Sequence, residues 1–330
     1  MALLQDASLL QTLLVVVGAL TLLRPLLSLL LTLHSLFLAR GISLRRFSSQ
    51  APRALITGAS DGIGAEFARQ LAAKGFEVTL VGRSKAKLQG VAEEIARASP
   101  SAKIELLILD FSDASHAGWE HLSASISSGT PIGVLVNNVG VSHAMPVPFA
   151  TSDAKENESI IAVNVAALVR VTHMVLPGMQ ARKSGLILNL GSFAGQFATP
   201  LLSTYSASKS FLLTFSKCLG AEQANARTGV RVTCLNTYFV VSAMSGIRRS
   251  NWLVPTPKSY VKTVLAKIGT SGGAGWRPYS ATLWPGHALA DWAITNLLPS
   301  ENWLLNYQYT SSLDVRRRAL RKAERQAKAQ

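Results

Sequence analysis

The hydrophobic positions of this chain follow two different patterns. Residues 9–38 are almost all apolar, and this run is long enough as one helix to cross a hydrocarbon core of about 30 Å. From residue 54 onward, short runs rich in Val, Ile and Leu alternate with longer stretches whose apolar residues recur at helical spacing. This alternation is typical of a parallel sheet flanked by helices, so the pattern predicts a single doubly wound α/β domain behind a transmembrane helix.

The expected strands are the short apolar runs, several of which are apolar enough to be buried on both faces. They lie at residues 54–57, 77–81, 104–109, 133–137, 186–190 and 230–236. Between two of them, Ser84 is a candidate helix N-cap, and Gly75 is placed to end the preceding helix. Past residue 240 the alternation fails, and a loop that we interpret as a substrate lid leads to a helix near 257–268.

Arg24 and Pro25 interrupt the N-terminal apolar run, so two shorter segments or a re-entrant hairpin remain alternatives to one spanning helix. Arginines follow this run within residues 40–46 and no Lys or Arg precedes it, which by the positive-inside rule places the following domain in the cytosol. A cleavable signal peptide would be shorter and begin with basic residues. Residues 44–49 look like the end of a mitochondrial presequence, but the apolar run is too continuous for one.

The net charge of +15 on 330 residues is concentrated near the ends of the chain. Residues 315–328 hold much of it, and together with residues 40–46 they are expected to rest on anionic headgroups, a solvated tail being the alternative. A nucleic-acid partner is not expected, because basic residues are not interleaved with aromatic ones and no known module is present. Cys218 and Cys234 lack metal-ligand or redox spacing, so both are interpreted as packing residues and no metal is expected.

These features divide the chain into three parts. Residues 1–47 form a membrane anchor with a basic flank, residues 48–280 the catalytic domain, and residues 281–330 an apolar segment and a basic tail. The apolar stretch 279–298, broken by Pro285, is either a second membrane contact, which we slightly favour, or a core helix.

A glycine-rich turn, Thr-Gly-Ala-Ser-Asp-Gly-Ile-Gly at 57–64, follows the first expected strand. A strand-to-helix turn uses glycine for tight dihedral angles and for close approach of backbone amides to a pyrophosphate, although a purely structural turn has the same composition. The second strand ends without an acidic residue but with Arg83, which would pair with a 2′-phosphate. This favours NADPH as the cofactor and reduction as the working direction.

Tyr205 and Lys209 are four residues apart on an expected helix and therefore lie on one face. The ammonium is expected to lower the phenol's pKa toward the working pH, which would make Tyr205 a general acid. Ser192 follows a strand at the carboxyl edge of the sheet, where its hydroxyl can bond a substrate carbonyl oxygen. Taken singly, a core tyrosine, a solvated lysine and a serine N-cap explain the same residues.

With Asn-Asn-Val-Gly at 137–140 and Asn164, these motifs occur in the order and spacing of the short-chain dehydrogenases/reductases, and the chain resembles that family. The resemblance implies that Lys209 also holds the ribose hydroxyls and that Asn164 holds a water in a proton relay. It further implies that Asp110 contacts the adenine ring, a helix cap being the alternative. The implied catalytic set is Ser192, Tyr205, Lys209 and Asn164. The implied cofactor-binding set is Gly58, Ser60, Asp61, Gly62, Ile63, Gly64, Arg83, Asp110, Asn137, Tyr205, Lys209, Val240 and Ser242.

The residues after the sixth strand, Asn-Thr-Tyr-Phe-Val-Val-Ser-Ala-Met at 236–244, replace the Pro-Gly that most of the family has there. Together with Pro-Thr-Pro-Lys at 255–258, they resemble the microsomal very-long-chain 3-oxoacyl-CoA reductases of the fungal type. The resemblance implies NADPH-dependent reduction of a 3-oxoacyl-CoA to the 3-hydroxyacyl-CoA in fatty acid elongation, at the endoplasmic reticulum membrane. The implied partners are an acyl-CoA substrate, the membrane, a condensing enzyme, a dehydratase and an enoyl reductase.

Two alternatives stay open beside this function. A 17-beta-hydroxysteroid dehydrogenase would have the same catalytic residues and differ only in pocket shape. A non-catalytic scaffold of an elongation complex would use the fold for contacts alone, and the intact Ser192, Tyr205 and Lys209 argue against it. Lys328 stands unpaired where relatives carry a dilysine retrieval signal, so retention by that route stays in doubt.

Overall fold

A seven-stranded parallel sheet forms the centre of the molecule, with strand order β3-β2-β1-β4-β5-β6-β7. The structure is a computed structural model that describes residues 2–48, 52–272 and 277–327. The strands are β1 Arg53–Thr57, β2 Glu77–Gly82, β3 Ile104–Ile108, β4 Ile132–Asn137, β5 Gly185–Leu190, β6 Val230–Leu235 and β7 Ser280–Ala281. The six expected strands and the doubly wound parallel sheet are confirmed.

Twelve helices are described, and three shorter turns adjoin them. They are α1 Ala2–Leu33, α2 Arg45–Ser48, α3 Gly62–Ala72, α4 Lys85–Ala98, α5 Gly118–Ser128, α6 Ala154–Ile161, α7 Ala167–Ala181, α8 Phe193–Gln196, α9 Ser203–Asn225, α10 Pro257–Ala266, α11 Pro285–Leu297 and α12 Glu301–Ala327. The turns are the π-helical His34–Leu38 and Ala162–Ala166 and the 3₁₀-helical Phe149–Thr151. The predicted N-cap is confirmed, because the Ser84 hydroxyl accepts a hydrogen bond from the backbone N–H of Lys87 in α4.

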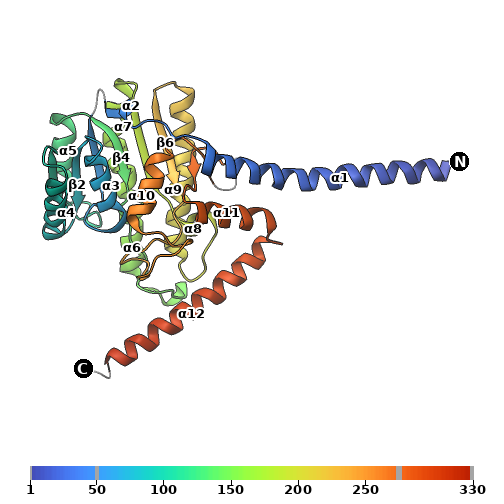
Figure 1. The fold of residues 1–330 in the computed structure, drawn as a ribbon. Coiled ribbons are helices and arrows are strands. Elements are labelled where there is room, and N and C mark those ends of the chain that lie inside the picture. The colour runs from blue at the N-terminus through green and yellow to red at the C-terminus, as the bar shows by residue number, and fades with distance from the viewer. Residues whose placement is uncertain (1, 49–51, 273–276, 328–330) are drawn as a thin grey trace.

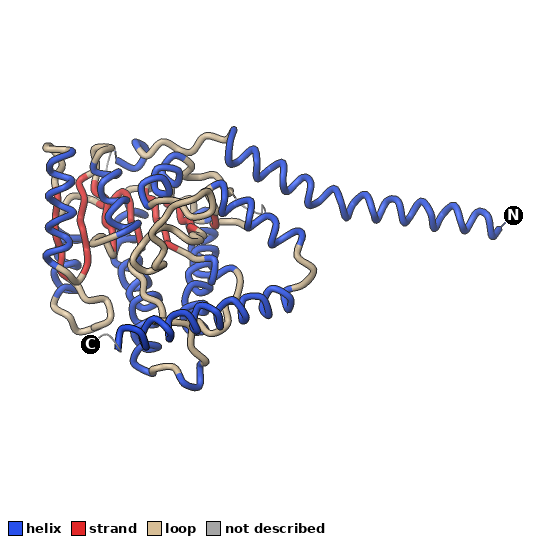
Figure 2. The backbone as a smooth tube through the Cα atoms, turned by 60° about the horizontal axis from the view of Figure 1, so that its bottom comes forward, coloured by secondary structure: helices blue, strands red, loops and turns tan. Residues whose placement is uncertain are grey.

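The helices cover the two faces of the sheet, which Figure 2 shows as strands enclosed between helices. Alternate residues of β1 point to opposite faces. Ile56 packs in a cluster with residues of α3, α4 and α10, whereas Leu55 packs in a second cluster with residues of α5, α7 and α9. Both clusters are buried, so each face of the sheet has its own hydrophobic core.

The strand order reverses between β1 and β4, which are neighbours in the sheet although β2 and β3 lie between them in sequence. The loops that leave the carboxyl ends of these two strands diverge, and open α/β sheets bind ligands in the crevice that this divergence creates. The glycine turn follows β1 and Asn138 follows β4, so the sequence places its candidate residues at this crevice.

The helix α1 leaves the domain as one continuous rod (Figure 1). Residues Ser8–Leu38 are a candidate membrane span, and their large apolar side chains are mostly exposed. A break at Pro25 was among the expected alternatives, but Pro25 lies inside the helix, since membrane helices tolerate the single backbone hydrogen bond that proline removes. The core helix formed by residues Ala154–Ala181 meets the same length and composition criterion, but almost half of it is buried in the domain.

Helix α11 packs against α1, and α12 then leads away from it. Helix α11 begins with Pro285 at its first turn and buries Ala288 and Asp291, so its inner face matches the core-helix alternative. The indole nitrogen of Trp292 donates a hydrogen bond to the Pro25 carbonyl of α1 at 3.3 Å. Helix α12 then crosses the lower end of the domain in Figure 1, where Arg316 donates to the Pro146 carbonyl at 2.9 Å.

The basic tail is therefore helical as far as Ala327. The segment around Lys328 and most of the linker at 48–52 lie outside the described residues.

Candidate active site

A glycine turn lies at the carboxyl end of β1. Gly58 and Gly62 have φ angles of 66° and 56°, in the left-handed region that residues with a Cβ rarely adopt. Gly64 packs against the turn itself, because a Cβ at this position would lie 2.2 Å from the Gly58 carbonyl oxygen. The backbone therefore requires all three glycines, and they hold the N-terminus of α3 at the crevice.

Two polar residues flank this turn. The Asp61 carboxylate caps α3 and accepts a hydrogen bond from the Gly62 N–H at 2.6 Å. On the opposite side, the Cβ of Ser242 lies 3.8 Å from the position that a Cβ on Gly62 would take. Ser60 and Ile63 are partly buried in the turn. Backbone amides at a helix N-terminus next to a serine form a cradle that fits a pyrophosphate.

Asn138 joins the turn to the end of β4. Its side-chain amide donates to the carbonyl oxygens of Thr57 and Gly58, both at 3.0 Å. The Asn138 backbone N–H in turn donates to the Thr57 hydroxyl at 3.0 Å. These bonds fix the distance between the two loops that form the crevice.

Asn137 was expected to contact the cofactor, but the structure corrects this prediction for its side chain. The Asn137 amide donates to the Thr172 hydroxyl and to the Asn189 carbonyl oxygen, both at 2.9 Å, and the residue is buried. It is the last residue of β4 and pairs with Asn189 of β5, so the strand register directs its side chain into the core. Asn138, one position later, is the asparagine that lies beside the turn.

Tyr205 and Lys209 lie on α9, at the carboxyl ends of the central strands. The ammonium nitrogen of Lys209 donates to the Leu190 carbonyl at 2.8 Å and lies 5.9 Å from the centre of the Tyr205 ring. The hydroxyl of Ser192, just past β5, caps α8 and lies close enough to the Tyr205 hydroxyl to lower its pKa. The structure therefore brings together Ser192, Tyr205 and Lys209, as the sequence predicts. Ser192 is also a helix N-cap, so the two interpretations of this residue hold together.

The electrostatics of this pair differ from the prediction. Burial raises the pKa of the Tyr205 hydroxyl, and the hydrogen bond with Ser192 offsets only part of this effect. Burial also lowers the pKa of Lys209 to about 8, against the opposing effect of Cys234. The expected lowering of the phenol's pKa is therefore wrong for the chain alone, because burial dominates it. Tyr205 keeps its proton at neutral pH, which suits a hydroxyl that donates one.

Asn164 lies in the π-helical turn Ala162–Ala166 between α6 and α7. Its carbonyl oxygen accepts from the Val141 N–H at 2.8 Å, and its amide donates to the Val141 carbonyl and the Ser208 hydroxyl, both at 2.9 Å. A Cβ on Gly140 would lie 3.3 Å from both the Asn164 carbonyl oxygen and the Lys209 ammonium. Asn164 and Lys209 therefore face the same small space, which a Cβ at position 140 would crowd.

Arg83 and Asp110 lie at the outer end of the crevice, after β2 and β3. The Arg83 side chain is exposed. Hydrogen bonds from the Ser112 hydroxyl and N–H lower the pKa of Asp110, and the charge of Arg83 adds to this effect. Asp110 thus shapes the turn after β3, as in the capping alternative, and it still stands at the crevice beside a cation.

A loop of residues 236–256 follows β6, and its Ser242 lies beside the glycine turn. The Val240 side chain is buried in the core, so only its backbone can face a ligand. Phe239, Met244 and Trp252 in this loop are more than half exposed. His287 of α11 binds both ends of the loop, because its Nε2 lies 3.1 Å from the Phe239 carbonyl and 2.9 Å from the Leu253 carbonyl.

Sequence reasoning missed a buried polar cluster behind α8. The carboxylate of Asp291 accepts from the Gln196 amide at 2.5 Å and the Thr282 hydroxyl at 2.7 Å, and it pairs with Arg277. Gln196 comes from α8, Arg277 and Thr282 flank β7, and Asp291 lies in α11, and these separations match no motif that the sequence reasoning used. The cluster ties α11 to the helix that Ser192 caps.

Known proteins match the chain at the levels of family, sequence and fold. Residues 52–252 match the family described as short chain dehydrogenase. A protein named very-long-chain 3-oxoacyl-CoA reductase from Mycosarcoma maydis is 51% identical over 85% of this chain and 79% of its own. The protein of the same name from Laccaria bicolor is 43% identical over 100% of this chain and 97% of its own.

Solved structures share the same fold. A short-chain dehydrogenase from Sphingobium yanoikuyae in complex with NADPH is 28% identical with a TM-score of 0.58, covering 65% of this chain and 83% of its own. A structure from a study of 7beta-hydroxysteroid dehydrogenase stereoselectivity has a TM-score of 0.68 and covers 80% of this chain and 99% of its own. Its sequence identity is 22%, so this similarity supports the fold and nothing more.

Proposed function

The chain belongs to the short-chain dehydrogenase family and is an oxidoreductase with a nicotinamide cofactor, and from this premise we propose that it reduces very-long-chain 3-oxoacyl-CoA to 3-hydroxyacyl-CoA with NADPH. One observation carries the catalytic part of this proposal. The hydroxyl of Ser192 lies close enough to that of Tyr205 to lower its pKa, beside the buried Lys209 and at the crevice that the glycine turn borders.

Each of these residues has a defined task in the reduction. The cofactor, when bound, supplies the hydride for C3 of the substrate. The hydroxyls of Ser192 and Tyr205 hold the carbonyl oxygen at that carbon, and Tyr205 transfers its proton to this oxygen as negative charge develops there. Lys209 places a positive charge behind the phenol, which stabilises the phenolate that the transfer leaves. The product is the corresponding alcohol.

The preference for NADPH follows from the end of β2. The strand ends at Gly82 and the next residue is Arg83, exposed and beside the crevice. A guanidinium pairs with a 2′-phosphate in a two-pronged hydrogen-bonded geometry, whereas the ribose hydroxyls of NADH would want an acidic residue here. Gly58, Gly62 and Gly64 with Ser242 would hold the pyrophosphate.

The substrate class rests on the relatives' names and on the apolar surface beside the crevice. Phe239, Met244 and Trp252 are exposed on the loop after β6, which we interpret as the substrate lid. Each CH₂ group of an acyl chain that leaves water contributes about 0.8 kcal/mol, so such side chains support a long chain. The basic character of the protein would attract the phosphates of CoA.

A long acyl chain partitions into a bilayer, so an enzyme anchored by α1 would meet its substrate there. We place the protein in the endoplasmic reticulum membrane with its catalytic domain in the cytosol. The positive-inside distribution of residues 40–46 supports this orientation. In this location it would act beside a condensing enzyme, a dehydratase and an enoyl reductase.

The test is NADPH oxidation by the full chain in detergent, with 3-oxostearoyl-CoA and a 17-ketosteroid compared at matched concentrations. We expect turnover of the acyl-CoA and none of the steroid. Turnover of the steroid alone would assign the chain to the hydroxysteroid dehydrogenases and leave the catalytic residues unchanged. Absence of turnover with both substrates, in protein that still binds NADPH, would contradict the proposal.

A further inference from the structure

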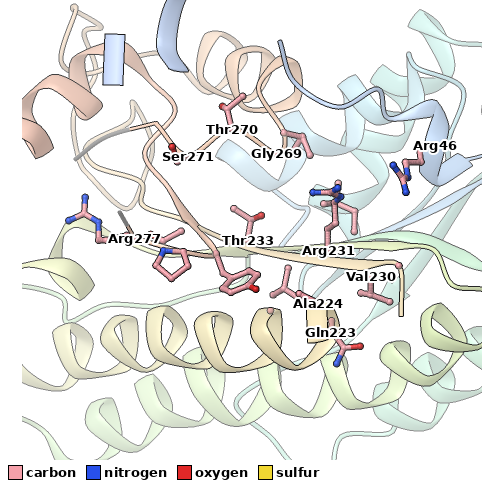
Figure 3. Close-up of a pocket in the computed structure, with 18 of the residues that line it drawn as sticks. Arg46, Gln223, Ala224, Val230, Arg231, Thr233, Gly269, Thr270, Ser271 and Arg277 are labelled. Atoms are coloured by element: carbon pink, nitrogen blue, oxygen red, sulfur yellow. The ribbon is translucent and has the colours of Figure 1, made fainter. Parts of the chain in front are cut away.

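A cavity of about 510 Å³ lies at the amino ends of β5 and β6, at the sheet edge opposite the active site (Figure 3). Its walls come from β6, the C-terminal end of α9, the segment Ile268–Ser271 and the segment Arg277–Ser280. The catalytic residues lie at the carboxyl ends of the strands, so this cavity belongs to neither the cofactor nor the substrate crevice.

The cavity is strongly basic. Four arginines line it, Arg46, Arg227, Arg231 and Arg277, and its described lining contains no aspartate or glutamate. Arg277 pairs with the buried Asp291, so its charge is matched. The other three are exposed and form no ion pair with any residue that the structure describes. We call this cavity the arginine pocket.

The strand pattern of β6 directs two polar side chains into this pocket. Val230 and Val232 are buried in the core with α7 and α9, so Arg231 and Thr233 point to the opposite face of the strand. β7 pairs only with the last two residues of β6, at Cys234 and Leu235, which leaves the first half of the strand without an outer neighbour. The alternation of β6 thus builds one wall of the pocket.

Arg46 comes from the segment that follows the membrane helix. It lies in α2, where the neighbouring Leu44 and Phe47 are buried in the core and fix the backbone. Figure 3 shows Arg46 and Arg231 on the same side of the pocket that both residues line. A guanidinium from the anchor segment and one from the sheet therefore face the same space.

The pocket lies beside the base of α1. The N–H of Gly272, next to the lining residue Ser271, donates to the hydroxyl of Ser35 at 2.9 Å. The N–H of Ile42 donates to the carbonyl of the lining residue Ile268 at 2.7 Å. Ser35 belongs to the candidate membrane span, so a bilayer that holds α1 brings its headgroups to the level of the arginine pocket.

We propose that the arginine pocket binds the phosphate of an anionic phospholipid. Arginine presents a rigid fork of donors that matches phosphate oxygens, and three unmatched guanidinium groups around one cavity suit a group with more than one charged oxygen. Thr233 and Ser271 add hydroxyls to the lining. A lipid bound there would fix the rotation and height of the catalytic domain on the membrane.

The experiment uses the full chain in nanodiscs of phosphatidylcholine with phosphatidic acid, and native mass spectrometry counts the lipids that stay bound. The unmodified chain is expected to retain phosphatidic acid in preference to phosphatidylcholine. The double substitution Arg46→Gln with Arg231→Gln is expected to weaken this retention about tenfold, because each cation near the surface contributes to anionic lipid binding.

A matched control removes two cations far from the membrane. Lys87→Gln with Arg97→Gln changes α4, which Figure 1 places at the end of the domain remote from α1, and should leave lipid retention unchanged. NADPH binding by both double variants should equal that of the unmodified chain, which shows that the fold is intact. Equal loss in both variants, or no loss in either, would overturn the proposal.

A second arm separates a lipid from a soluble phosphate. Glycerol 3-phosphate is titrated into the detergent-solubilised chain and its binding is followed by calorimetry. Weak binding of glycerol 3-phosphate, at millimolar concentrations, supports a lipid as the occupant. A bilayer holds lipid phosphates beside the pocket, so a lipid does not need a tight intrinsic affinity. Tight binding that the Arg46 and Arg231 substitutions abolish would overturn the lipid assignment and make the ligand a soluble phosphate.

Discussion

The side-chain amide of Asn164 donates a hydrogen bond to the hydroxyl of Ser208, one residue before Lys209, at 2.9 Å. That hydroxyl donates in turn to the carbonyl of Tyr205 at 2.7 Å. Two linked hydrogen bonds therefore connect Asn164 of the π-helical turn to the backbone of Tyr205 on α9. Ser208 is buried and its hydroxyl is engaged in both of these hydrogen bonds, so we infer that it positions Tyr205 and Lys209.

Ser208→Ala should lower kcat up to about tenfold, since it removes hydrogen bonds that each stabilise by roughly 1 kcal/mol. The KM for NADPH should change little, because the glycine turn is untouched. Ser208→Thr keeps the hydroxyl and should restore kcat. Steady-state kinetics of both variants check this, and an equal rise of KM and fall of kcat would indicate a general structural defect instead.

Tyr205→Phe should abolish turnover while NADPH binding stays intact. A general acid contributes on the order of 100- to 10,000-fold to a rate, and the ring itself is retained, so packing on α9 is preserved. Stopped-flow measurement of NADPH oxidation and fluorescence titration of NADPH binding separate the two effects. A rate within tenfold of the unmodified chain would show that another group supplies the proton.

The pH dependence of the reduction should reflect Lys209. Burial lowers the pKa of Lys209 to about 8, while burial raises the pKa of Tyr205, so the phenol keeps its proton where the lysine loses its own. Below pH 8 the ammonium is present, and as the pH rises through about 8 it is lost, so kcat/KM should fall. Thermal unfolding at pH 9.5 is the control that the chain stays folded, and a flat profile to that pH would contradict the assignment.

The sequence predicts this fold well because its strands are encoded locally. Six runs of branched apolar residues each form a strand. Five of them contain buried residues, and β3 at the edge of the sheet is partly buried along its length. The seventh strand, Ser280–Ala281, has only two residues and pairs with β6 through Cys234 and Leu235. A strand of two residues is held in place by pairing with β6. Two residues are too few to show a periodic pattern, so the sequence does not predict this strand.

The active-site residues also fall into two groups, those that the sequence predicts and those that only the folded structure identifies. Tyr205, Lys209 and Ser192 were predicted because each follows from a helix spacing or a strand end. The choice between Asn137 and Asn138 could not be, because it depends on which side of β4 faces the core, and the pairing with β5 decides that. Asp291 lies in an apolar stretch, and it meets Arg277 of the preceding segment and the distant Gln196 only in the folded chain, which shows why a carboxylate is there.

Arg83→Ala should reduce the preference for NADPH over NADH. The guanidinium is exposed at the end of β2, and a hydrogen bond to a charged group contributes about 1.5–3 kcal/mol, so the ratio of kcat/KM for the two cofactors should fall roughly ten- to a hundredfold. Turnover at saturating NADPH should persist, because Tyr205 and Lys209 are unchanged. An unaltered ratio would place the 2′-phosphate elsewhere.

Acid should destabilise the chain through His287. Burial lowers the pKa of His287 to about 4 from its ordinary value of 6.5, so the folded chain holds this ring neutral where the unfolded chain protonates it. Between pH 6.5 and pH 4 the unfolded state therefore binds more protons, and the free energy of unfolding falls as the pH is lowered through that range. The loss attributable to this group is roughly 3 kcal/mol.

His287→Gln removes that titration and should flatten the pH dependence of stability between pH 6.5 and pH 4. It should also lower stability at neutral pH, because the ring binds the carbonyls of Phe239 and Leu253. His121→Gln on the exposed surface of α5 is the matched control and should keep the pH dependence of the unmodified chain. Chemical unfolding in detergent at a series of pH values measures all three proteins. If the His287 variant and the unmodified chain lose stability in parallel, the acid sensitivity comes from the carboxylates instead, since these are common to both proteins.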